Sequence, residues 1–404
     1  MRAARAALVV LAVALALPAA SASTAPAAAP GLDGALEQAL RASGVAPDRA
    51  AAIAVDLRTG ETVYGKNISR SLLPASAEKL AVSLTALRVL GPHFRFRTEV
   101  VGVGARSGPV WHGNLGLVGY GDPTLTRADL DRLARRFAAT GIRRIAGSVF
   151  GDDTHFDTRR DGLGWKRSYL GIESPPLSAL AVAGLPFAGA NGSAAAAARA
   201  FTEALEQRGI VVSGRPGSGR APAQSLTIAF DLSEQLSRIV RRMDADSNNF
   251  VAEMVLKELG STVDTRGSSA AGVRVVRATL ADAGVPLAGV RIADGSGLSR
   301  FDRFTVRALA EILRAGVADP SIRDVFVSSL AVAGVSGTLK ARLDLRPTRG
   351  RVRAKTGTTN RASALAGLVG SRYVFAILHN GSPVPYWTAR TAQDRFVTVL
   401  ARSS

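Results

Sequence analysis

The chain has 404 residues and a formal net charge of +19, a length that allows two domains with buried cores. Its content of 47% hydrophobic and 21% charged residues excludes a disordered polymer. The absence of cysteine excludes disulfides and thiolate metal sites.

The first residues predict export. Two arginines precede an apolar run over residues 6–17, and an Ala-Ser-Ala cleavage pattern follows at 20–22. This order is typical of a secretory signal peptide, here residues 1–22, and an Ala/Pro linker follows over 23–31. About 12 apolar residues are too few to span a bilayer, so we expect no transmembrane segment in the mature chain. The predicted location is the periplasm or the extracellular cell wall.

The strong positive charge favours polyanionic partners. Because export disfavours nucleic acid, anionic wall polymers and acidic membrane surfaces are the better candidates. Charge alone does not identify a partner, so a role in solubility stays equally open.

The first part of the mature chain predicts a helix, two strands and a second helix. The first helix is expected over 32–42, and the strands over 51–55 and 62–64. The second helix begins near Ser76, has leucines at helical spacing, and ends at Gly91-Pro92.

Residues 94–223 differ in composition, with short strands, Gly-rich turns and two helices. We expect them to form an inserted α/β domain between two parts of a catalytic domain, residues 32–93 and 224–404. Four elements are predicted in the insert: strands over 110–118 and 145–150, and helices over 127–140 and 194–207.

The remaining sequence predicts helices followed by an antiparallel sheet. Helical spacing resumes with Leu232 and Leu236. Short turns separate three late strands, which favours an antiparallel meander. The other expected elements are helices over 250–259, 270–283 and 386–400, and strands over 351–356, 362–369 and 373–378.

Lysine is scarce, which makes each lysine informative. Only six of the 51 basic residues are lysine: Lys66, Lys79, Lys166, Lys257, Lys340 and Lys355. A guanidinium group is never deprotonated in practice, whereas a buried amine can lose its proton and act as a base. Lysines retained in an arginine-rich chain therefore point to amine chemistry.

Two of these lysines lie in short polar motifs. Ser76-Ala77-Glu78-Lys79 places a hydroxyl and an amine three residues apart, on one face of a helix. A serine becomes a nucleophile when a neighbouring base takes its proton, and a desolvated lysine can be that base. Alone, the motif is equally typical of a serine N-cap followed by a solvated lysine.

A second motif, Ser247-Asn248-Asn249, stands at the start of a predicted helix. Its hydroxyl could shuttle a proton and its amide could orient a substrate amide. Serine and asparagine are also common helix caps, so this motif by itself is weak.

The third motif, Lys355-Thr356-Gly357-Thr358, ends a predicted strand. The glycine allows close approach of a ligand backbone, and the lysine and threonines suit a carboxylate. The backbone N–H groups of Thr358 and Ser76 could together form an oxyanion hole.

The order of the three motifs is typical of β-lactamases and penicillin-binding proteins. The chain most closely resembles the D-alanyl-D-alanine carboxypeptidase/endopeptidase family (peptidase S13) typified by penicillin-binding protein 4. Further segments carry this resemblance over nearly the whole mature chain: Gly121-Asp122-Pro123, Asp152-Asp153, Asp294 to Arg300, and Gly337-Thr338-Leu339.

The resemblance implies a serine transpeptidase/β-lactamase-like fold, with an antiparallel sheet flanked by helices. It implies hydrolysis of the terminal D-Ala-D-Ala bond of peptidoglycan stem peptides, possible action on D-Ala cross-links, and covalent inhibition by β-lactams. No cofactor or metal is implied.

The family mechanism assigns each motif residue a role. Lys79 deprotonates Ser76, which attacks the penultimate D-Ala, and Ser247 passes a proton to the leaving amine. Asn249 binds the substrate amide. The residues implied to hold the terminal carboxylate or the oxyanion are Lys355, Thr356, Gly357 and Thr358.

Two departures and three alternatives remain. The chain has Asp244-Ala245 where the family commonly has Asn-Lys, and it is shorter than the longest members. A β-lactamase of the same fold would need a deacylating base, for which Glu173 lies in the right interval. A non-enzymatic, basic wall-binding protein is the second alternative.

Metal sites are the third alternative. Asp152, Asp153, His155 and Asp157 form an acidic cluster in the insert, for which a structural turn is favoured over a cation site. His93, His112 and His379 are scattered without metal-ligand spacing, which disfavours a zinc hydrolase.

Overall fold

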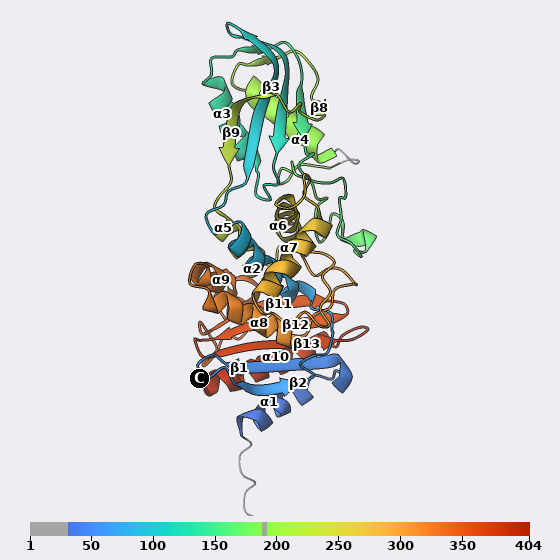
Figure 1. Cartoon of the computed structure of the whole chain (residues 1–404), viewed down its shortest axis with the longest axis vertical. Helices are drawn as coiled ribbons and strands as arrows, with labels where there is room; N and C mark the ends of the chain where they lie inside the picture. Colours follow the sequence, from blue (N-terminus) through green and yellow to red (C-terminus); the bar gives the residue numbers. More distant parts are fainter. Residues whose placement is uncertain (1–30, 188–191) are drawn as a thin grey trace, which may run out of the picture.

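The computed structural model describes residues 31–187 and 192–404. The predicted signal peptide and nearly all of the linker lie outside these residues. Within the described ranges, no helix has the length and apolarity needed to cross a membrane. The molecule is elongated, with one sheet near each end of its long axis and a group of helices between them (Figure 1).

The first sheet has six strands in the order β10-β11-β12-β13-β1-β2, and every neighbouring pair is antiparallel. The predicted meander is confirmed, since β11, β12 and β13 pair in sequence order. Strand β1 comes from the start of the chain and pairs with β13, so both ends of the chain build one sheet. The strands are β1 (Ala50–Asp56), β2 (Thr62–Lys66), β10 (Ala331–Val332), β11 (Val352–Thr359), β12 (Ala362–Val369) and β13 (Tyr373–Asn380).

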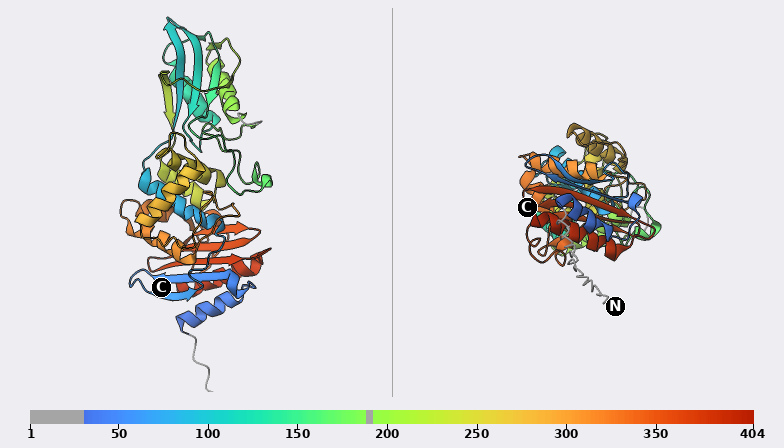
Figure 2. Two further views of the ribbon diagram at one scale, coloured as in Figure 1. Left: turned by 45° about the vertical axis from the view of Figure 1, so that its right-hand side comes forward. Right: turned by 90° about the horizontal axis from the view of Figure 1, so that it is seen from below.

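Both faces of this sheet are buried. Alternate residues of β13 point to opposite faces: Val374 and Leu378 join the core with α2 (Lys79–Val89) and α8 (Val306–Ala318). Phe375 and Ile377 join a second core with α1 (Leu32–Arg41) and α10 (Tyr386–Arg402). Figure 2 shows α1 and α10 on the outer side of the sheet, away from the rest of the molecule. The predicted transpeptidase-like arrangement of an antiparallel sheet flanked by helices is confirmed.

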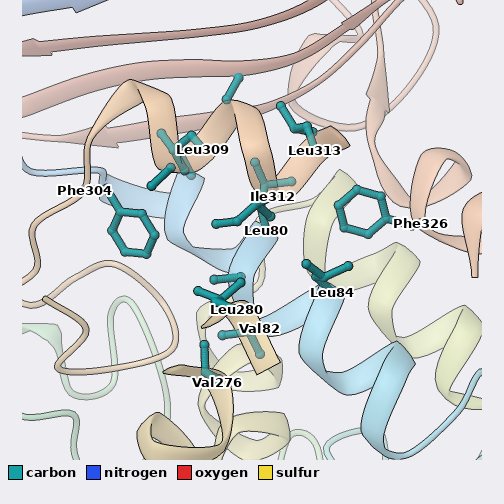
Figure 3. Packing of buried hydrophobic residues seen from close by; sticks show 14 of the residues in the cluster. Leu80, Val82, Leu84, Val276, Leu280, Phe304, Leu309, Ile312, Leu313 and Phe326 are labelled. Carbon is teal, nitrogen blue, oxygen red and sulfur yellow. The ribbon is translucent and has the colours of Figure 1, made fainter. Parts of the chain in front are cut away.

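Helix α2 is buried along most of its length, which explains its apolar sequence. Leu80, Val82 and Leu84 lie among side chains of α7, α8 and α9 (Figure 3). Besides α2 and α8, the helices between the two sheets are α5 (Leu236–Ala245), α6 (Asn249–Ser261), α7 (Ser269–Asp282) and α9 (Arg323–Ser329). This dense packing gives the start of α2 a rigid base.

The second sheet has seven strands and mixed pairing, with α3 (Arg127–Ala138) and α4 (Gly192–Glu206) packed on it. Thr126 and Asp129 form a capping box at the start of α3. The strands are β3 (Arg97–Ser107), β4 (Val110–Gly119), β5 (Arg144–Ile145), β6 (Val149–Asp152), β7 (Val211–Val212), β8 (Gly217–Ser218) and β9 (Leu226–Leu232).

Two sequence expectations for local structure were wrong. Leu232 lies in β9 opposite Arg97 of β3, and α5 begins only at Leu236, because pairing with β3 overrides the helical spacing. The predicted strand over 145–150 is two strands, separated where Gly147 approaches the backbone of Gly113. Since β9 belongs to the second sheet, this sheet extends to Leu232, beyond residue 223.

Candidate active site

Ser76 lies in a 3-10 turn, Ala75–Glu78, that leads directly into α2. Ala75 has φ +46°, a left-handed conformation that side chains with a Cβ rarely adopt. Such strain persists only where the surroundings enforce it, and it is common at functional sites. The turn places Ser76 and Lys79 on one face, with Ser76 Oγ 2.9 Å from Lys79 Nζ.

Lys79 is fully buried and surrounded by oxygen atoms. Its Nζ lies 2.8 Å from Asn249 Oδ1 and 2.6 Å from the Ser296 carbonyl oxygen, in addition to Ser76 Oγ. Burial lowers the pKa of Lys79 to about 8, against the opposing effect of carboxylates that include Asp294. A neutral Lys79 amine has two N–H groups, which can keep donating hydrogen bonds to Asn249 and to the Ser296 carbonyl while the nitrogen lone pair faces Ser76.

The second motif lies at the start of α6, with Ser247 and Asn248 before the helix and Asn249 as its first residue. Asn248 caps α6, accepting a hydrogen bond from Val251 N at 3.0 Å, as expected of a helix start. Ser247 has φ +60°, and its Oγ accepts a hydrogen bond from Lys355 Nζ at 2.8 Å. The structure therefore brings Ser247 and Asn249 to the two motif lysines, while Asn248 is a structural residue.

The third motif lies on β11. Lys355 is fully buried, and burial together with the nearby Lys79 charge holds its pKa well below the ordinary value. Thr356 and Thr358 are two apart on a strand and so share a face. Thr356 Oγ1 donates to Thr338 Oγ1 at 2.8 Å.

Two glycines pack closely against the backbone of residues 74–76. A Cβ added to Gly357 would lie 3.0 Å from Ser76 N and 2.8 Å from the Pro74 carbonyl oxygen. A Cβ added to Gly297, at φ +80°, would lie 2.0 Å from the Ala75 carbonyl oxygen. Only glycine fits at both positions, which explains why β11 and the 294–297 turn can hold the Ser76 backbone between them.

Asp294 organises this turn. Its oxygens accept hydrogen bonds from Gly297 N (2.8 Å), Ser299 N (2.9 Å) and Ser296 Oγ (3.1 Å). Trp165, from the loop between β6 and α4, donates a hydrogen bond from its Nε1 to Asp294 Oδ2 at 2.6 Å. Through this hydrogen bond and the one that the Ser296 carbonyl accepts from Lys79, the turn connects the Trp165 loop to the motif residues.

Asp244, which with Ala245 replaces the Asn-Lys common in the family, has a buried carboxyl group. Its Oδ2 accepts hydrogen bonds from Ser83 Oγ at 2.7 Å and Ser329 Oγ at 2.8 Å. Burial raises its pKa to about 6, although these hydrogen bonds and the charges of Lys355 and Lys79 act in the opposite direction. A negative charge here faces both motif lysines, a role that no local sequence pattern indicates.

Glu173 reaches the site from a loop that precedes α4. Asn249 Nδ2 donates to the Glu173 carbonyl oxygen at 3.1 Å and to its Oε2 at 3.3 Å. Two cavities of about 480 and 630 Å³ meet at this loop, one lined by Ser247 and Asn249, the other by Thr358. Sequence reasoning singled out Glu173 only by its position between motifs.

The acidic cluster of the insert is occupied by the protein's own groups. Each of its members has a hydrogen-bond or ion-pair partner, as the favoured structural turn requires. The partners are Thr154 and Ala221 backbone N–H groups for Asp152, Arg160 for Asp153, Glu258 for His155, and Lys257 for Asp157.

A buried lysine amine beside a serine hydroxyl, next to a strand that carries a second buried lysine, is the arrangement expected of a serine acyl-transfer enzyme. The fold is similar to that of penicillin-binding protein 4 (dacB) from Haemophilus influenzae, which superimposes with a TM-score of 0.80 at 23% identity, covering 91% of this chain and 98% of that one.

A family model described as the D-Ala-D-Ala carboxypeptidase 3 (S13) family matches residues 32–188 and 183–403. The chain is 33% identical to a D-alanyl-D-alanine carboxypeptidase from an Actinomadura species, over 86% of this chain and 80% of the relative. It is 29% identical to carboxypeptidase DacB from Mycolicibacterium smegmatis, over 85% of this chain and 78% of the relative. The chain therefore belongs to the D-Ala-D-Ala carboxypeptidase 3 (S13) family, and the predicted serine carboxypeptidase class is confirmed.

Proposed function

We propose that this chain releases the terminal D-Ala of peptidoglycan stem peptides through an acyl-enzyme on Ser76. The observation that carries this assignment is the 2.9 Å separation of Ser76 Oγ from the buried Lys79 Nζ. A pKa lowered to about 8 lets a usable fraction of Lys79 be the neutral amine at physiological pH.

The acylation step follows from this pair. Neutral Lys79 takes the Ser76 proton as Oγ bonds to the carbonyl carbon of the penultimate D-Ala. The charge that develops on the carbonyl oxygen faces the N–H groups of Ser76 and Thr358. Collapse breaks the C–N bond, and Ser247 relays the proton held by Lys79 to the leaving D-Ala amine, so that Ser247 keeps its hydroxyl and Lys79 is neutral again. Water then hydrolyses the ester and restores Ser76.

Substrate recognition uses the other motif residues. Asn249 donates an N–H to the substrate amide. Lys355 and the hydroxyls of Thr356 and Thr358 hold the terminal carboxylate, with Gly357 leaving room for it. The cavity beyond Ser247 and Asn249 gives space for a larger leaving group, so we extend the proposal to D-Ala cross-links.

Three further assignments belong to this proposal. The chain is exported to the periplasm or cell wall, as its first 22 residues indicate. Its net charge of +19 favours anionic wall polymers as an additional partner. The inserted domain comprises residues 94–232, since β9 completes its sheet.

Release of D-Ala from a synthetic stem pentapeptide tests the proposal. Wild type should release D-Ala, and Ser76→Ala should not. Ser69→Ala, an exposed serine outside the site, is the matched control and should behave as wild type. A pentapeptide left intact by correctly folded wild type would contradict the carboxypeptidase assignment and favour a wall-binding role.

A β-lactamase is the second candidate, because the Glu173 carboxylate lies against Asn249 at 3.3 Å. Rapid turnover of penicillin, with a short-lived Ser76 adduct, would favour it. A long-lived adduct would favour the carboxypeptidase.

A further inference from the structure

Beneath Lys79 lies a group of buried carboxyl groups that the mechanism above does not use. Glu78, Asp294 and Asp302 are each 0% exposed. Each offers a carboxyl oxygen, and these oxygens lie within 4.8 Å of one another. Glu78 immediately precedes Lys79 in the chain, so its state of ionisation bears directly on the base.

The three carboxyl groups differ in the donors that surround them. Asp294 accepts four hydrogen bonds. Asp302 accepts one, from Ala293 N to Oδ1 at 2.8 Å, and its Oδ2 has no partner. Among the described residues, no donor reaches either carboxyl oxygen of Glu78. The ionised form is thus best supported in Asp294 and least supported in Glu78.

An ionised carboxyl group that is buried without a donor is strongly disfavoured. Two carboxylates that share one site also cannot both ionise near neutral pH. We propose that Glu78 is protonated at neutral pH and donates its proton to Oδ2 of Asp302, so that the pair acts as a single negative charge. Burial, followed by the charges of Asp302 and Asp294, raises the pKa of Glu78 well above its ordinary value. Burial also raises the pKa of Asp302, but the hydrogen bond from Glu78 acts to lower it, so Glu78 is the partner that keeps the proton.

The proton on Glu78 matters because Lys79 faces several acidic groups. Asp294 from the cleft turn, Glu253 from α6, Asp244 from α5 and Glu78 itself each favour the charged form of Lys79. An ionised Glu78 would hold the proton on Lys79 more tightly and reduce the free base. Glu78 is therefore a positioning residue that acts through Lys79, and this consequence rests on the function proposed above.

A bound cation would be another way to neutralise these groups, but the donor set argues against it. Hard cations such as Ca²⁺ need six to eight oxygen ligands. The oxygens of Asp294 are already occupied by four hydrogen-bond donors. A proton satisfies the free oxygens of Glu78 and Asp302 without further ligands.

Infrared spectroscopy of Glu78→Gln tests the assignment. At neutral pH, the difference spectrum between wild type and this variant should contain the carbonyl band of one buried protonated carboxyl group. Any band from Glu253, whose pKa burial raises to about 8, is common to both proteins and cancels. Glu61→Gln, an exposed control, should keep the band. This readout needs no catalysis, so it stands even if the proposed peptidase activity fails.

The pH profile of acylation is the second readout. Because Glu78→Gln replaces a neutral carboxyl group with a neutral amide, the rise of the acylation rate with pH should occur at the same pH in the variant as in wild type. If the rate rises at lower pH in Glu78→Gln than in wild type, Glu78 is ionised in wild type, which would overturn the proposal. So would a cation retained in native mass spectra of wild type and lost from the variant.

If Glu78→Gln does not fold, a second variant still tests the proposal. Glu253→Gln removes the other buried glutamate near Lys79. Labelled with carboxyl-¹³C glutamate, this protein should retain an isotope-shifted band from Glu78. Absence of any such band would overturn the proposal.

Discussion

Lys79 Nζ lies 2.9 Å from Ser76 Oγ, and Lys79 itself has no exposed surface. The pair is held at the entry of a buried helix, between β11 and the turn that Asp294 organises. The Lys79 amine is therefore held against the serine hydroxyl and away from solvent, and in the proposed mechanism its protonation sets the reactivity of Ser76.

The rate of acylation should rise with pH. In the proposed mechanism the neutral form of Lys79 is the base, and its pKa is lowered to about 8. The rate constant for acylation by penicillin should therefore increase as pH rises through about 8 and then level off. Stopped-flow measurements between about pH 6 and about pH 9 check this limb. A rate that falls over this interval would mean that the charged amine is the active form.

Lys79→Arg should lose acylation by roughly 10²–10⁴-fold, the usual contribution of a general base. A guanidinium group keeps the positive charge but does not deprotonate. Lys66→Arg is the control, because Lys66 pairs with Glu37 away from the site and should remain active. Substantial acylation by Lys79→Arg would show that another group takes the Ser76 proton.

Ser247→Ala should lower pentapeptide turnover by roughly 10²-fold or more, since it removes the proposed proton donor to the leaving amine. It also removes the hydroxyl that accepts a hydrogen bond from Lys355 at 2.8 Å. Steady-state kinetics with Ser328→Ala, an exposed serine, as the control check the effect. Unchanged turnover in Ser247→Ala would show that another group donates the proton to the leaving amine.

Glu173→Gln separates the carboxypeptidase from the β-lactamase. The amide can still accept a hydrogen bond from Asn249, but it cannot activate water. The carboxypeptidase account predicts an unchanged lifetime of the penicilloyl adduct, measured by the return of activity after removal of free penicillin. A lifetime extended roughly 10²-fold would identify Glu173 as a deacylating base.

Asp244→Asn should alter how stability depends on pH. The folded pKa of Asp244 is raised to about 6 from 3.8, so its contribution to stability is fully present below about pH 4 and is lost as pH rises through about 6. The variant lacks this loss, so its Tm relative to wild type should increase between about pH 4 and about pH 7. A constant difference in Tm across this range would contradict the raised pKa.

Local sequence information was sufficient for the motifs and the meander. Ser76 and Lys79 are three residues apart on one short turn, so their contact follows from helical spacing. Strands β11, β12 and β13 follow one another with short turns, so antiparallel pairing needed no long-range information.

Contacts between distant segments were not predictable in this way. Glu173 meets Asn249 across 76 residues, and Trp165 meets Asp294 across 129, with no periodic pattern that links them. Leu232 continued a helical pattern, yet pairing with β3 placed it in a strand. Whether Glu78 and Asp244 are buried depends on packing of the whole helical layer.

Mass spectrometry of the penicillin-treated protein identifies the nucleophile itself. We expect one penicilloyl group per chain, located by peptide mapping on Ser76, and no adduct on Ser76→Ala. An adduct on another residue, or a folded wild type that remains unlabelled, would contradict the assignment of Ser76 as the nucleophile.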